Sequence, residues 1–98
     1  MRKGEIAELK MQKMLRAGED TDTTVHKSIF LRYDDKQECI YLALQEGKLT
    51  DISLDGLYQC EMQTETGKQS CIGRIKERYD VGTDAVVKLQ IENGFYKI

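Results

Sequence analysis

The sequence predicts a mainly β fold: a small antiparallel β-barrel of about six strands, preceded by an amphipathic α-helix. Three observations favour it. The chain has 98 residues, enough for one small domain with a single core. After residue 24, short segments with apolar residues at alternating positions continue almost to the end. Turn-forming residues separate these segments, and in so short a chain only a barrel or a compressed sandwich buries both faces of such strands. We favour the barrel.

The helix is expected near the start of the chain, over 4–17. Four apolar residues there follow helical spacing, with charged residues between them: Ala7, Met11, Met14 and Leu15. Gly18 supplies a C-terminal stop. The polar segment 19–24 is expected to be a linker, so residues 1–24 form the helix and linker and residues 25–98 the barrel domain. The apolar stripe is expected to cover the barrel or, alternatively, to join two copies in a homodimer.

Six later segments are predicted to be strands. They are 25–33, 39–44, 49–54, 57–62, 70–79 and 85–92. The second is apolar at both sets of alternating positions, so it is expected to pair on both sides within the sheet. Asp55-Gly56 suits the positive φ of a tight turn or a bulge. A turn centred on 65–66 would place Cys60 opposite Cys71 across a hairpin.

Composition excludes several classes of protein. Fifteen basic and 17 acidic side chains give a formal charge of -2, which argues against a broad basic face for nucleic acid. No apolar run is long enough to cross a bilayer, and the first ten residues lack the apolar stretch of a signal peptide. We therefore expect a cytoplasmic protein without a membrane span, with nucleic acid disfavoured as a partner.

Catalytic and metal-binding patterns are scarce. Cys39, Cys60 and Cys71 include no closely spaced pair, so free thiols are favoured over a zinc site built from them and His26. His26 is the only histidine and is expected to face solvent from a strand. No G-x-S-x-G element or glycine-rich phosphate loop occurs. We expect no enzyme activity, no metal and no cofactor.

One motif carries recognisable chemistry, the sequence Asp-Ile-Ser-Leu-Asp-Gly at 51–56. On a strand, Ile52 and Leu54 would point into the core, and Asp51 and Ser53 would share the other face. A carboxylate beside a hydroxyl can accept the N–H groups of a guanine edge. The plainer interpretation is that both side chains bind nearby backbone at a turn. The glycine would let the chain bend sharply.

This motif resembles the D/N-x-S-x-x-G motif of PilZ domains, small β-barrels that act as receptors for the bacterial second messenger cyclic di-GMP. The segment 71–75, Cys-Ile-Gly-Arg-Ile, is similar to the later PilZ strand that carries a G-x-V pattern. The resemblance covers about 25–92. The candidate nucleotide-binding residues that it implies are Asp51, Ser53 and Gly56.

The chain departs from this family at one point. PilZ domains that bind cyclic di-GMP carry an R-x-x-x-R motif ahead of the first strand, whose arginines hold phosphates and guanine edges. Here the segment 18–24 is acidic. An R-x-x-x-R string occurs at Arg74 to Arg78, but on a strand these residues would lie about 13 Å apart. They are therefore not equated with the loop arginines of the family.

Two functions from different classes remain. The first is a non-enzymatic regulatory or adaptor module in cyclic di-GMP signalling that acts through a protein partner, with cyclic di-GMP bound weakly or not at all. The alternative is an OB-like barrel that binds single-stranded nucleic acid, which requires exposed aromatic residues beside lysines on one face of the sheet.

Overall fold

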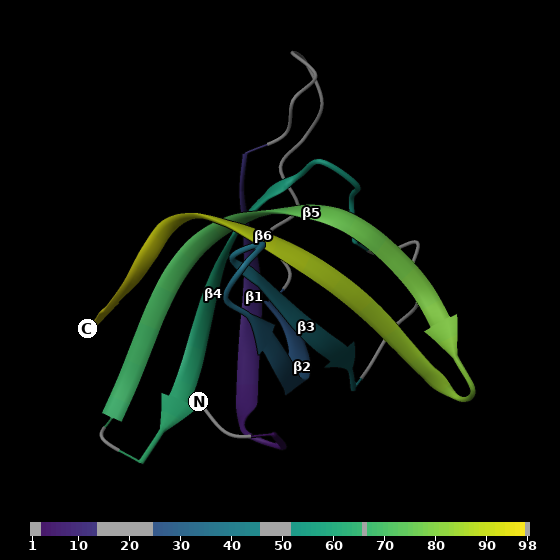
Figure 1. The fold of residues 1–98 in the computed structure, drawn as a ribbon, viewed down its shortest axis with the longest axis horizontal. Helices are drawn as coiled ribbons and strands as arrows, with labels where there is room; N and C mark the ends of the chain where they lie inside the picture. The colour runs from purple at the N-terminus through teal and green to yellow at the C-terminus, as the bar shows by residue number, and fades with distance from the viewer. Residues whose placement is uncertain (1–2, 14–24, 46–51, 66, 98) are drawn as a thin grey trace.

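The computed structural model describes residues 3–13, 25–45, 52–65 and 67–97. Six strands form within these ranges: β1 (Ile6–Lys13), β2 (Val25–Asp34), β3 (Cys39–Leu44), β4 (Leu57–Thr64), β5 (Gly67–Val81) and β6 (Asp84–Lys97). They close a barrel in the order β1-β2-β3-β6-β5-β4, and every neighbouring pair is antiparallel (Figure 1). The predicted six-stranded antiparallel barrel is confirmed.

The predicted helix is wrong over 6–13, where the chain forms β1. This strand pairs with β2 along one edge and with β4 along the other, which closes the barrel. Ala7, Leu9 and Met11 alternate with polar neighbours and are all buried in the core. The same residues therefore fit a period of two as well as a helical period. A strand also hydrogen-bonds the open edges of β2 and β4, which a helix cannot do.

This change moves the start of the barrel. The barrel includes residues 6–13, ahead of residue 25, where the predicted barrel domain begins. Ala7 and Met11 belong to the core, so they are not available to an intermolecular helical stripe. The rest of the predicted helix and the linker, 14–24, lie outside the described residues.

The predicted strand over 49–54 is also wrong in its described part. Residues 52–56 form a bend and a turn between β3 and β4. Ile52 is buried in the core, whereas Leu54 is 47% exposed, so the two side chains do not share a face. The number of strands remains six because β1 takes the place of this segment. Asp51 lies outside the described residues.

The core occupies the inside of the barrel and is built from all six strands. Its largest fully buried side chains include Tyr58, Leu9, Ile40, Leu42, Ile52 and Met62. Each fully buried aliphatic side chain of this size contributes roughly 1.5–3 kcal/mol. Cys60 lies opposite Cys71 in the β4–β5 register, as predicted, and both are buried free thiols.

The strand β3 is covered on both faces. It pairs on both sides, as predicted, and its neighbours are β2 and β6. Ile40 and Leu42 point into the main core, so alternation turns Cys39 and Tyr41 to the outer face. There they form a second small cluster with Val86, against which Leu31 packs. The barrel therefore has a second, smaller apolar cluster that is buried on the outer side of β3.

The strands β5 and β6 are the longest, and they curve strongly across the molecule (Figure 1). Three irregularities interrupt their register, between Ser70/Ile72, Ile72/Gly73 and Ile75/Glu77. Such bulges increase the twist and bending of a strand pair.

None of the described residues belongs to a helix long and apolar enough to cross a membrane.

Candidate functional site

The described part of the motif, which we call the 52–56 loop, is a compact turn. The Ile52 side chain anchors it in the core, and Asp55 adopts a positive φ of 61°. The Gly56 N–H donates a hydrogen bond to the Ser53 carbonyl at 3.1 Å. The Ser53 N–H donates to the Tyr58 hydroxyl at 3.0 Å, so the buried tyrosine ring supports the loop from below. The loop is thus held by contacts with the barrel as well as by the hydrogen bond within the loop.

Gly56 is needed for close approach. A Cβ atom there would lie 3.0 Å from the Ser53 carbonyl oxygen and 3.0 Å from Cε1 of Tyr58. The positive φ of this turn belongs to Asp55 instead, a residue type that tolerates the left-handed region better than most. The tight turn predicted at Asp55-Gly56 is therefore confirmed, with the strained conformation on the aspartate.

The 52–56 loop is joined to the backbone of β5. The Asp55 N–H donates to the Ile75 carbonyl at 2.8 Å, and the Ile75 N–H donates to the Gly56 carbonyl at 3.1 Å. These two hydrogen bonds continue the β4–β5 pairing, which ends in the ladder at Leu57 opposite Arg74. The loop consequently lies along β5 in a fixed register.

Two arginines of β5 hold the same loop. Arg74 donates from Nη1 to the Asp55 carbonyl at 2.9 Å, and Arg78 donates from Nη1 to the Ile52 carbonyl at 2.6 Å. The Lys76 ammonium lies 4.0 Å from the Asp55 carboxylate. Both arginines of the R-x-x-x-R string therefore contact the motif loop. Their spacing of four residues along a strand had argued against one site for both of them. The two arginines need not meet each other, because the loop runs past both.

Arg74 is further engaged by Glu92 on β6. Its Nε lies 2.8 Å from Oε2 and its Nη2 lies 3.4 Å from Oε1, a two-pronged ion pair. The hydrogen bond from Arg74 lowers the pKa of the Glu92 carboxyl and raises the pKa of Arg74. The Arg74 guanidinium thus uses all three of its nitrogens on protein acceptors.

The remaining candidates lie elsewhere. His26 is buried, contrary to the expectation of a solvent-facing side chain, and its ring meets the Tyr58 ring edge-on at 6.3 Å between centroids. It points inward because the first part of β2 alternates, and His26, Ser28 and Phe30 are its buried positions. Within the described ranges, no three His, Cys, Asp or Glu side chains gather as metal ligands would.

The sequence-predicted site is therefore only partly assembled by the described residues. Ser53 and Gly56 lie in one loop, and Asp51 is outside the described ranges. The flanking arginines come from β5, and each lies 19 or 26 residues after the loop residue that it contacts. Comparison of the chain with models of protein families, with curated proteins and with solved structures finds no match. The resemblance to PilZ domains rests on the motif residues.

Proposed function

We propose that this chain is a non-enzymatic PilZ-like regulatory or adaptor module of bacterial cyclic di-GMP signalling that acts through a protein partner and binds cyclic di-GMP weakly or not at all. One observation carries the proposal. The guanidinium groups that flank the motif loop, those of Arg74 and Arg78, bind the loop's own backbone carbonyls.

A phosphate would have to compete with these internal contacts. Arg74 makes one hydrogen bond with the Asp55 carbonyl and a two-pronged ion pair with Glu92, and a partly exposed ion pair of this kind contributes up to about 1 kcal/mol. Turning this guanidinium towards a ligand would leave the Glu92 carboxylate and the loop carbonyl without their donor. The arrangement stabilises the loop and disfavours recruitment of Arg74 by a dinucleotide.

Calorimetric titration with cyclic di-GMP tests the ligand part of the proposal. The unmodified chain is expected to give no saturable heat in the micromolar range. Asp51→Ala, in the motif, and Asp35→Ala, on the exposed β2–β3 turn, form a charge-matched pair of variants. Micromolar binding that Asp51→Ala abolishes and Asp35→Ala preserves would overturn the proposal and indicate a full cyclic di-GMP receptor.

A further inference from the structure

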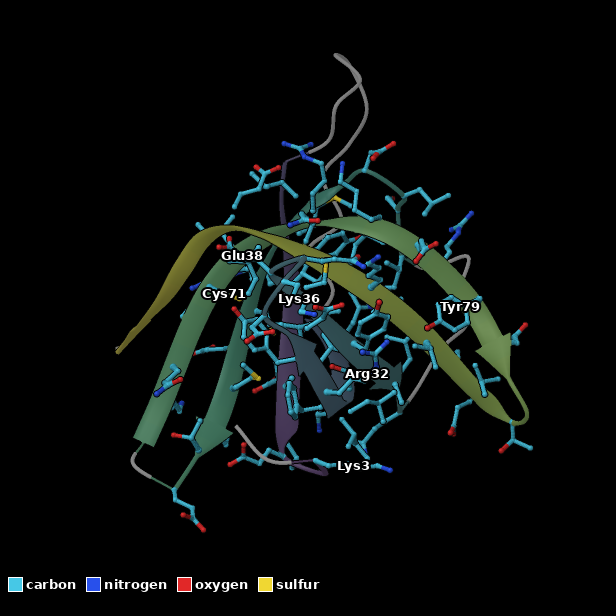
Figure 2. All side chains as sticks on the ribbon, in the orientation of Figure 1. Lys3, Arg32, Lys36, Glu38, Cys71 and Tyr79 are labelled. Carbon is cyan, nitrogen blue, oxygen red and sulfur yellow. The ribbon has the colours of Figure 1, made fainter. Side chains whose placement is uncertain are left out.

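A pocket of about 300 Å³ lies on the outer face of the barrel, away from the 52–56 loop. Its walls come from the segment before β1, from β2 and β3, and from the hairpin where β5 ends and β6 begins. Lys3, Arg32 and Tyr79, which line it, lie on the same side of the molecule (Figure 2). None of the residues discussed above for the motif loop contributes to it.

The floor of the pocket is aromatic and apolar. Tyr41 points outward from β3, yet it is only 8% exposed, because it packs beside Val86 and Leu31 and beneath Arg32. Tyr79 on β5 lies opposite Val86 in the β5–β6 register and is 38% exposed. The pocket therefore offers one covered ring and one open ring on adjoining parts of a curved surface.

Arg32 forms a platform above the covered ring. Its Cζ lies 3.9 Å from the centroid of Tyr41, the distance of a stacked cation–π contact. A guanidinium is planar, so the face turned away from Tyr41 can accept a second ring. The exposed edge of the same group keeps its N–H donors for an anion.

The charge of the pocket favours an anion. Two cations, Lys3 and Arg32, line it, against one carboxylate, Asp84. Among the described residues, neither cation takes part in an ion pair. An anionic group bound between them would gain from apolar walls that exclude part of the solvent and strengthen the attraction.

We propose that this pocket binds a small ligand that combines one planar aromatic ring with one anionic group, a phosphate or a carboxylate. The ring would stack on Arg32 beside Tyr79, and the anion would meet Lys3 and the guanidinium edge. A volume of about 300 Å³ is at the lower end for ligand pockets, so it suits a single ring system rather than a dinucleotide. This site does not depend on the adaptor function proposed above.

Amide chemical-shift titrations of the isotope-labelled full chain test the proposal with four probes. AMP carries a ring and a phosphate, 4-hydroxybenzoate carries a ring and a carboxylate, adenosine has only the ring, and inorganic phosphate has only the anion. At least one of the first two is expected to shift amides of β2, β3 and the distal β5–β6 hairpin saturably. Adenosine and phosphate are expected to bind at least about tenfold more weakly, because each lacks one of the two contacts.

Three results would overturn the proposal. One is the absence of saturable shifts with both AMP and 4-hydroxybenzoate. Another is equal binding of inorganic phosphate, which would mean a simple anion site. The last is much tighter binding of a single-stranded oligonucleotide than of AMP, with shifts extending beyond the pocket, which would favour the OB-like alternative.

Variants connect the binding to the named side chains. Arg32→Gln is expected to weaken binding of the better probe by about tenfold or more, and Arg32→Lys, which keeps the charge but loses the planar face, by an intermediate factor. Tyr79→Leu removes the open ring without disturbing the core. Lys68→Gln, an exposed site at the other end of β5, is the charge-matched control and should leave binding unchanged. Wild-type affinity in Arg32→Gln would refute the assignment.

Discussion

Replacing Gly73 with alanine is expected to destabilise the barrel by about 3 kcal/mol or more. Gly73 lies within β5, paired with Tyr58 on β4 and Ile91 on β6, next to a register shift of the β5–β6 ladder. A Cβ atom at this position would lie 2.5 Å from the Gln90 carbonyl oxygen and 2.8 Å from Cγ of Leu89. The glycine of the G-x-V-like segment therefore permits a close approach between two strands.

The magnitude follows from what would have to move. Ordinary contact begins at 3.4 Å, so the carbonyl would have to retreat by about 0.9 Å. It belongs to the β6 backbone, whose Gln90 also pairs with Cys39 on β3, so no rotamer change relieves the clash. Overpacking typically costs about 1–3 kcal/mol, and a clash with backbone belongs at or above the upper limit. A loss of about 3 kcal/mol corresponds to a fall of roughly 12–24 °C in Tm.

Urea unfolding followed by circular dichroism measures this loss. Gly82→Ala in the β5–β6 turn is the matched control, because Gly82 has a φ of +62° but a Cβ atom added there would meet no other atom within 4 Å. Its cost, from the left-handed backbone alone, is expected to be about 1 kcal/mol. If Gly73→Ala loses no more stability than Gly82→Ala, the close approach of β5 and β6 is wrong.

Three further predictions concern the loop, the ion pair and the thiols. Tyr58→Phe should cost about 1 kcal/mol and accelerate hydrogen exchange of the Ser53 amide, because its acceptor is lost; unchanged exchange would contradict the contact. Glu92→Gln should cost less than about 1 kcal/mol at neutral pH, because the pair is partly exposed. Arg74 lowers the pKa of Glu92, so the stability that this pair contributes is present above the unfolded pKa of about 4.3 and is lost as the pH falls through the lower folded pKa. Urea unfolding of both proteins at several pH values should therefore show a difference in stability that vanishes in acid. A difference in stability that does not change with pH would refute the pairing. Hydrogen bonding to a neighbouring thiol and burial raise the pKa of Cys60 well above its usual range, so a thiol reagent should label it only after unfolding; rapid labelling of the native protein would show that it is accessible.

Local patterns in the chain were sufficient for much of the fold. Turn residues and alternation located β2, β3, β4 and the β4–β5 hairpin, and the turn at 65–66 correctly placed Cys60 opposite Cys71. The N-terminal segment was mistaken for a helix because Ala7 and Met11 satisfy both periods. Only the open edges of β2 and β4, far away in the sequence, select the strand.

The site was less predictable than the strands. The motif identified Gly56 and the turn, but it did not reveal that Ser53 leaves the strand geometry or that Tyr58 supports it. The two arginines were set apart from the motif by their spacing along a strand. That distance is irrelevant once the loop lies lengthwise on β5 and each guanidinium meets a different carbonyl.

Neighbouring residues alone were enough to define most of the antiparallel strands, their turns and the near-neutral charge, because alternation, turn chemistry and composition are local properties of the chain. Three other matters became visible only in the folded barrel: the strand state of 6–13, the engagement of Arg74 by the loop and Glu92, and the grouping of Lys3, Arg32 and Tyr79 around one pocket. Each depends on groups distant in the chain that meet only when the barrel closes. The pairing of β1 with two strand edges, the hydrogen bonds of Arg74 and the concave shape of the pocket all arise when the barrel closes.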